Sequence, residues 1–108
     1  MNFEIIATDT FERKLRRLAK KYKSLKVDLL KLVEELEKNP LIGDPVGKNC
    51  YKIRLAITSK GKGKSGGGRI ITLVRLTKKT VYLIDIFDKS EQSTITDKEL
   101  KLLISFLE

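Results

Sequence analysis

The spacing of apolar residues changes once along this chain, and that change limits the folds open to it. Up to about Leu36 they recur at intervals of three and four, and from Cys50 they alternate with polar residues. The first spacing gives a helix one apolar face, whereas the second gives a strand one apolar face. We therefore predict helices followed by strands, packed together in a single α+β domain over residues 1–108.

Two helices are predicted before the change. Asp9-x-x-Glu12 fits a capping box, and the first helix ends near Tyr22. Ser24 can cap a second helix, and Asn39-Pro40 stops it because the residue before proline is pushed out of helical angles. Since the connection is very short, the two helices should lie antiparallel as a helical hairpin.

The strands are predicted from β-branched and alternating segments. Phe3–Ala7 is an expected edge strand, and Leu41–Asn49 is expected to be loop. Tyr51–Thr58 should place Ile53, Leu55 and Ile57 on one face of the sheet. Ile70–Leu76 is apolar almost throughout, as in a central strand buried on both faces, and Val81–Phe87 completes a meander.

A last helix follows the meander, because Thr96-x-x-Glu99 fits another capping box ahead of an apolar stripe. The predicted order is β-α-α-β-β-β-α, with the helical hairpin packed on a small, mainly antiparallel sheet.

Positive charge is concentrated in one part of the chain. The net charge is +9, and no acidic residue lies between Asp44 and Asp85. A stretch of this length that carries only positive charge favours a polyanion such as nucleic acid as its partner. Aromatic residues are too few to predict a broad platform for stacking bases. With no apolar run of membrane-spanning length, no signal peptide and the single Cys50, we expect a cytoplasmic location.

The stretch Lys60–Arg69, K-G-K-G-K-S-G-G-G-R, joins two predicted strands. Its glycines allow sharp bends, its lysines supply mobile cations, and Arg69 adds a fork suited to two phosphate oxygens. Gly63-Lys64-Ser65 does not make a P-loop, because Thr58 stands where that motif needs glycine and a strand follows. A disordered, solvated hairpin tip is the alternative interpretation.

The first predicted helix also has a basic face. Its cations are Arg13, Lys14, Arg16, Arg17, Lys20 and Lys21. This face is either solvated, in contact with a nucleic acid backbone, or a docking surface for an acidic partner segment.

Three local patterns, together with the order of the elements, resemble the RelE/ParE superfamily of bacterial toxins, and the HigB-like and RelE-like members most closely. Lys52-x-Arg54 lies on the second predicted strand. Residues 61–71, G-K-G-K-S-G-G-G-R-I-I, resemble the G-R-G-K-x-G-G-x-R-V-I motif of HigB-like toxins. Residues 82–91, Y-L-I-D-I-F-D-K-S-E, resemble the fourth strand of those toxins.

The resemblance implies a type II toxin that cuts messenger RNA on the ribosome without a metal or cofactor. It implies partners of three kinds: the ribosome, messenger RNA and a cognate antitoxin, expected to be a helix-turn-helix protein from the adjacent gene. The catalytic residues implied by the motifs are Arg54, Lys64, Arg69, Phe87 and Lys89. Lys52, Lys60 and Lys62 are implied to bind RNA. The four catalytic cations are expected to converge on the concave face of the sheet, opposite the helices.

Two departures from the family pattern leave the proton transfers open. The chain has no histidine, and Phe87 stands where many relatives have tyrosine, although its ring could still stack on a base. A lysine within the cation cluster, or Asp85 on the expected face of Phe87, could accept the proton. A toxin of the same fold that inhibits gyrase, as in the ParE branch, and a non-catalytic RNA-binding module remain as alternatives.

Overall fold

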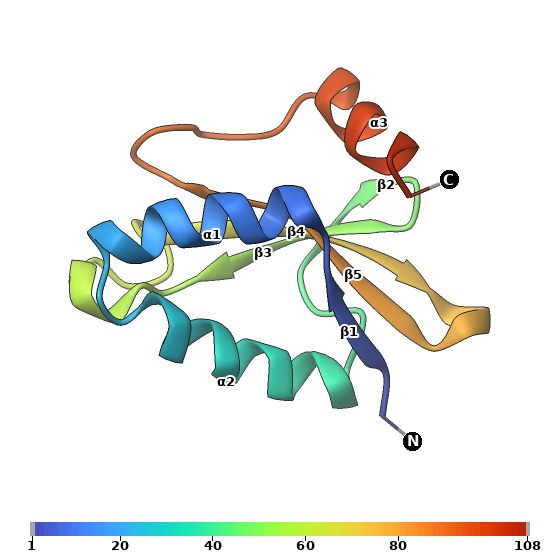
Figure 1. Cartoon of the computed structure of the whole chain (residues 1–108), viewed down its shortest axis with the longest axis horizontal. Coiled ribbons are helices and arrows are strands. Elements are labelled where there is room, and N and C mark those ends of the chain that lie inside the picture. Colours follow the sequence, from blue (N-terminus) through green and yellow to red (C-terminus); the bar gives the residue numbers. More distant parts are fainter. Residues whose placement is uncertain (1, 108) are drawn as a thin grey trace.

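The computed structural model describes residues 2–107 as three helices and a five-stranded sheet (Figure 1). The strands are β1 (Glu4–Ala7), β2 (Asp44–Gly47), β3 (Cys50–Leu55), β4 (Gly68–Arg75) and β5 (Thr80–Asp88). The helices are α1 (Asp9–Lys21), α2 (Leu25–Lys38) and α3 (Asp97–Ser105). Two 3₁₀ turns, η1 (Thr58–Lys60) and η2 (Leu76–Lys78), flank β4 in the chain. No helix within residues 2–107 has the length and apolarity needed to cross a membrane.

The strands lie in the order β1-β5-β4-β3-β2. β1 pairs with β5 in parallel and forms one edge, as predicted, while all other neighbours are antiparallel. The predicted α+β fold with a mainly antiparallel sheet is therefore confirmed.

Each face of the sheet carries its own apolar core. Ile53, Leu55 and Ile57 pack beneath α1 and α2, as the alternation along this segment predicted. Ile71 and Leu73 on the opposite face pack with Leu100 of α3. β4 is consequently buried on both sides, which explains why its sequence is apolar almost without interruption.

Two predicted boundaries of the sheet are wrong. The segment expected to be loop contains β2, a four-residue edge strand that tolerates Pro45 because an edge needs hydrogen bonds on one side only. The strand predicted to reach Thr58 ends at Leu55. Thr58 instead begins η1, where Asp28 of α2 accepts hydrogen bonds from its backbone N–H and its hydroxyl at 2.9 and 2.6 Å.

The predicted caps have mixed outcomes. Thr8, not Asp9, caps α1, because the Thr8 hydroxyl accepts the Phe11 N–H. Ser24 precedes α2 without a side-chain cap, since its hydroxyl donates to Asp28 and accepts from the Ser59 N–H. The Thr96–Glu99 capping box at the start of α3 is confirmed.

Candidate nucleic-acid interface

The glycine–lysine loop (residues 61–67) lies at the end of the sheet where β3 and β5 finish and β4 begins. It lies beside the connection between α1 and α2 (Figure 1). Gly61 and Gly63 have φ angles of 72° and 64°, which side chains other than glycine rarely adopt. A Cβ on Gly67 would lie 2.2 Å from the Leu55 carbonyl oxygen, so only glycine lets the loop pack against the end of β3. The chain thus returns tightly against the sheet after Lys64 and Ser65.

Arg69 holds this loop from within the protein. Its guanidinium donates to the carbonyl oxygens of Gly68, Lys64 and Ser65 at 2.9, 3.0 and 3.3 Å. Only 4% of the residue is exposed. The guanidinium that was predicted to bind phosphate oxygens therefore binds backbone carbonyl oxygens of the same chain. Arg69 fixes the conformation of the loop that carries the neighbouring lysines.

Arg54, Arg69 and Phe87 form a row across β3, β4 and β5. Arg54 lies opposite Arg69, and Arg69 lies opposite Phe87. Residues opposite each other on antiparallel strands share a face, so the row lies on the face away from α1 and α2. Arg54 is exposed on that face. Burial lowers the pKa of Arg69, and the positive charge of Arg54 lowers it further.

The two remaining catalytic cations of the prediction come close to this row. Lys64 is exposed in the loop and, like Arg54, lines a groove between α2 and β3. The Lys89 N–H donates to the Gly67 carbonyl oxygen at 3.0 Å, which places Lys89 beside the loop. The backbone positions of all four predicted cations therefore gather at one end of the sheet.

The predicted RNA-binding lysines fall into two groups. Lys62 is exposed in the loop, and Lys52 lies half-buried two residues before Arg54 on the same strand face. Lys60 is different, because its ammonium bonds the Asp88 carboxylate at 2.5 Å and its side chain is only 9% exposed. Its charge is neutralised inside the protein, contrary to the expectation of a mobile cation.

Asp88 is the centre of a buried polar cluster that sequence reasoning missed. It is 0% exposed and accepts from the Tyr22 hydroxyl, Lys60 and both the N–H and hydroxyl of Ser90. Burial alone would raise the pKa of Asp88, but these hydrogen bonds outweigh it and hold the pKa well below its ordinary value. Tyr22 ends an apolar helical stripe, so nothing local indicated that its phenol would find a carboxylate on β5.

Two residues considered for stacking and proton transfer are engaged inside the protein. Phe87 is 3% exposed and packs in the core with Ile84 and Leu100, so its ring is not open to a base in this structure. The register shifts by one residue between Ile71 and Thr72 where β4 pairs with β5. The extra residue on β5 is Ile84, so Asp85 keeps the strand parity of Phe87, but its carboxylate is paired with Lys14 of α1 at 2.6 Å.

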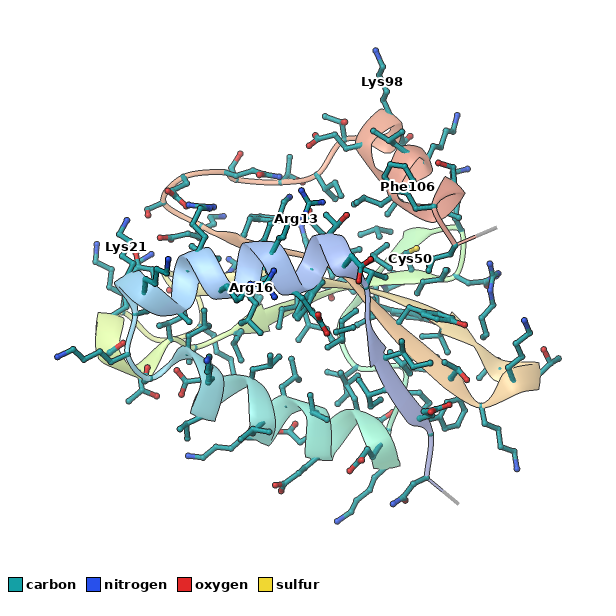
Figure 2. The ribbon with its side chains drawn as sticks, in the orientation of Figure 1. Arg13, Arg16, Lys21, Cys50, Lys98 and Phe106 are labelled. Atoms are coloured by element: carbon teal, nitrogen blue, oxygen red, sulfur yellow. The ribbon has the colours of Figure 1, made fainter. Side chains whose placement is uncertain are left out.

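Half of the predicted basic face of α1 is paired internally. Besides Lys14, Arg17 pairs with Glu91 at 3.5 Å, and Lys21 approaches Asp88 at 3.9 Å. The other side of the hairpin has a shallow basic groove of about 460 Å³. Its lining consists of Arg16, Ala19, Lys20, Lys23 and Lys26, and Figure 2 shows Arg16 on α1.

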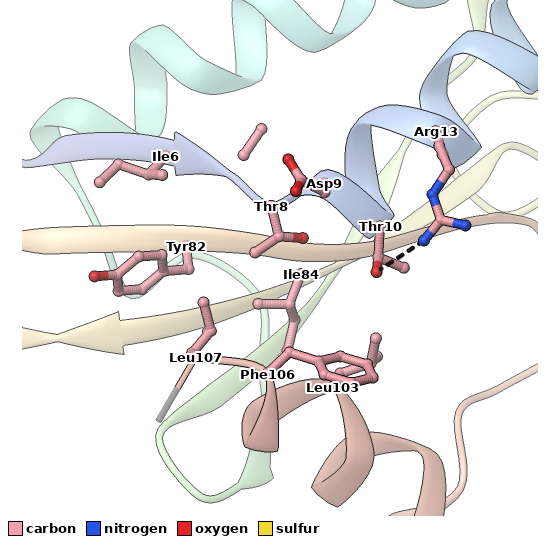
Figure 3. A pocket seen from close by; sticks show the side chains of 11 residues that line it. Ile6, Thr8, Asp9, Thr10, Arg13, Tyr82, Ile84, Leu103, Phe106 and Leu107 are labelled. Atoms are coloured by element: carbon pink, nitrogen blue, oxygen red, sulfur yellow. Dashed lines mark hydrogen bonds between the residues drawn. The ribbon is translucent and has the colours of Figure 1, made fainter.

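A cavity of about 490 Å³ lies apart from the cation cluster, between β1, the start of α1 and α3 (Figure 3). Its walls are mainly apolar, with Ile6, Ile84 and Phe106 among them. Arg13 is its one cation, and its guanidinium reaches the Thr10 hydroxyl at 3.5 Å. Within residues 2–107, no three His, Cys, Asp or Glu side chains are grouped so that they could hold a metal ion.

Replacing Arg69 with alanine is expected to destabilise the protein by about 1–3 kcal/mol, because the carbonyl oxygens of Lys64, Ser65 and Gly68 lose their donor. Arg69→Lys should recover little of this, since one ammonium cannot reproduce the fork. Chemical denaturation would measure both variants against Lys78→Ala, which removes an exposed cation from η2. An Arg69→Ala protein as stable as the parent would contradict the anchoring role.

The fold and the sequence both match known toxins. The profile described as "RelE toxin of RelE / RelB toxin-antitoxin system" matches residues 8–106. A mutant of the E. coli toxin RelE in the free state is 21% identical, with a TM-score of 0.62 over 86% of this chain and 90% of that one. A chain of the intact E. coli RelBE toxin-antitoxin complex also matches, at 21% identity and a TM-score of 0.61 over 80% of this chain and 95% of the matched one.

The isolated E. coli RelE toxin matches over 96% of this chain and 98% of its own, with 21% identity and a TM-score of 0.56. At this identity the structural matches establish the fold alone, whereas the profile spans nearly all of the described residues, including the cation row and the glycine–lysine loop. This chain belongs to the RelE toxin family of type II toxin–antitoxin systems.

Proposed function

We propose that this toxin is a ribosome-dependent endoribonuclease that cuts messenger RNA without a metal ion. The observation that carries the proposal is the cation cluster at the end of the sheet. Arg54 lies beside Arg69, and the backbone contacts of the glycine–lysine loop bring Lys64 and Lys89 close to them. No acidic residue occurs between Asp44 and Asp85 to offset this charge locally in the sequence.

The proposed reaction is an internal transfer at phosphorus. The ribose 2′-oxygen attacks the adjacent phosphorus while the bond from phosphorus to the 5′-oxygen breaks. The products are a 2′,3′-cyclic phosphate and a free 5′-hydroxyl. Negative charge on the phosphoryl oxygens grows in the transition state, so fixed cations there lower the barrier. Arg54 and Lys64 are exposed and can contact these oxygens directly, while Arg69 acts by holding the loop.

The proton transfers are assigned to lysine. The sequence has no histidine, Phe87 has no hydroxyl and is buried, and Asp85 is paired with Lys14. Lys64 and Lys89 are the remaining ionisable side chains of the cluster, since arginine stays protonated. We assign removal of the proton from the 2′-hydroxyl and protonation of the 5′-oxygen to these two lysines.

The proposal includes two macromolecular partners. The ribosome would present the messenger RNA, and a cognate antitoxin would bind the toxin and hold it inactive. The solved E. coli RelBE structure is a complex of a toxin with its antitoxin. An acidic antitoxin segment would complement the basic groove of Arg16, Lys20, Lys23 and Lys26 on the hairpin.

The test is transcript cleavage by the purified toxin on translating ribosomes, with primer extension to locate the cuts. Cuts inside translated regions that persist when a zinc-selective chelator is added, with the magnesium of the ribosomes kept, support the proposal. Growth arrest with intact transcripts and inhibited gyrase would replace it with the ParE-type activity. Salt-sensitive RNA binding without cutting or arrest would leave a non-catalytic RNA-binding module.

Binding of single-stranded RNA should weaken steeply with salt, because each phosphate neutralised releases counterions. Reversing both Lys62 and Lys64 to glutamate should lower the slope of log K against log salt by about 1.4, since each lost contact contributes about 0.7. Fluorescence anisotropy over a salt series measures the slope.

The matched control reverses Lys78 and Lys98, which are exposed in η2 and α3 and lie away from the loop (Figure 2 labels Lys98). This control has the same net charge as the loop variant. Equal slopes for the two double variants would show that the net charge, rather than the loop, attracts the RNA.

A further inference from the structure

We propose that the groove between α2 and β3 is a nucleobase-binding subsite, which selects the base next to the cleaved phosphate. This inference rests on the proposed function, because it assigns part of the specificity of the same site. The groove has a volume of about 260 Å³. Its lining includes Asp28, Leu32, Glu35, Arg54, Ala56 and Lys64.

The position of the groove connects it to the cation cluster. Arg54 and Lys64 belong to both. A nucleotide whose phosphate contacts these two cations can therefore extend its base into the groove. A drug-sized ligand usually occupies a larger pocket, of about 300–1,000 Å³, so this groove suits a single small planar group.

The groove follows an open edge of the sheet. β2 pairs with β3 only at Cys50, Tyr51 and Lys52. Beyond Lys52, the part of the chain that the structure describes places no strand beside Ile53–Leu55 on this side. An uncovered strand edge offers backbone N–H and C=O groups that can bond the polar edge of a base.

The opposite wall is one stripe of α2. Asp28, Lys31, Leu32 and Glu35 follow the i, i+3, i+4, i+7 spacing that places side chains on a single helix face. Leu32 and Leu55 are buried apolar side chains between the two walls, and Ala56 is half-buried beside them. The apolar floor suits the face of a base, and the small side chain of Ala56 leaves room for it.

Glu35 is the group that can distinguish one base from another. The other carboxylate of the groove, Asp28, is occupied by Thr58 and Ser24, and these hydrogen bonds keep its pKa lowered despite the opposing effect of burial. The Glu35 side chain is exposed, with no ion pair or hydrogen bond to its carboxylate within residues 2–107. A carboxylate only accepts hydrogen bonds, so it favours bases with an exocyclic amino group over uracil, whose single donor, N3–H, is flanked by the acceptors O2 and O4.

The experiment measures cleavage of ribosome-bound transcripts randomised around the cut, for the parent toxin, Glu35→Gln and Glu34→Gln. At one flanking position the parent should disfavour uracil relative to adenine, cytosine and guanine. Glu35→Gln should reduce this discrimination about tenfold at that position only, because the glutamine amide can also donate to O4. Glu34→Gln makes the same change on an exposed α2 residue outside the groove and should retain the parent profile.

Ala56→Leu supplies a second readout, because it fills the groove. It should weaken binding of short 2′-deoxy oligonucleotides, which cannot be cleaved, about tenfold, while thermal melts confirm folding. Base discrimination by the Glu35→Gln toxin equal to that of the parent would overturn the subsite while leaving the RNase proposal intact. Selective, Glu35-dependent binding by a protein that never cleaves would overturn the RNase proposal and retain the subsite.

Discussion

Arg54→Ala is expected to slow transcript cleavage about a hundredfold, equivalent to ~2.7 kcal/mol of lost transition-state stabilisation. Arg54 is exposed on the face that carries the cation row, beside the buried Arg69. Its guanidinium can therefore meet a phosphate without displacing any part of the protein. Removal of an exposed strand cation should leave the melting temperature nearly unchanged. Single-turnover cleavage on ribosomes, with melts on the same preparations, measures both effects.

The comparison with Arg69→Ala makes this result specific. Arg69 is a buried anchor of the loop, so its loss should reduce stability and cleavage together, whereas loss of Arg54 should affect cleavage alone. Lys78→Ala, which removes a cation from η2, serves as the charge control. A folded Arg54→Ala toxin that cuts at the parental rate would remove Arg54 from the mechanism.

The spacing of apolar residues was sufficient to predict most of the fold, because both periods reflect which side chains are buried. β3 alternates and β4 is apolar almost throughout, and the structure buries them mainly on one face and on both faces respectively. β2 was missed because its four residues, Asp-Pro-Val-Gly, contain three that are typical of turns. It is an edge strand, and pairing with β3 rather than local preference forms it.

The grouping of the candidate site could also be predicted, because it depends on the hairpin between β3 and β4. Arg54 and Arg69 stand on opposite sides of one connection, and pairing of the two strands places them side by side. What the local sequence could not predict is which cations would be buried. Lys60 forms an internal ion pair with Asp88, and Arg69 donates hydrogen bonds to backbone carbonyl oxygens. The partner of Lys60, Asp88, lies 28 residues away in the chain.

The ion pair of Asp85 is another contact that the local sequence did not record. Asp85, Ile86 and Phe87 pair regularly with Ile71, Ile70 and Arg69, so Asp85 keeps the strand parity predicted for it. Its carboxylate is nevertheless bound by Lys14 of α1, which lies 71 residues away in the chain. A pair of this kind arises from tertiary packing, and the alternation of residue types does not record it.

Asp88 connects this packing to the stability of the toxin. Its carboxylate joins Tyr22 at the end of α1, Lys60 at the end of η1, and Ser90 after β5. The folded protein holds the pKa of Asp88 below its ordinary value of 3.8. A carboxyl with a lowered pKa adds stability that is complete above its unfolded pKa and is lost as the pH falls toward its folded pKa. The stabilisation from Asp88 should therefore be full at neutral pH and decline below about pH 4.

Asp88→Ala is consequently expected to cost about 3–5 kcal/mol at pH 7, because it leaves the buried ammonium of Lys60 without its counter-charge. Out of a total of about 5–15 kcal/mol for a typical domain, this is a large fraction. Adding Lys60→Met to Asp88→Ala should restore part of the lost stability, because it removes the unpaired charge. The control Glu34→Ala removes an exposed carboxylate and should have little effect on stability. Urea denaturation at pH 7 and pH 3 measures these differences, and the gap between parent and Asp88→Ala should narrow at the lower pH. A gap of the same size at both values, or no rescue by Lys60→Met, would show that Asp88 does not act as the buried partner of Lys60.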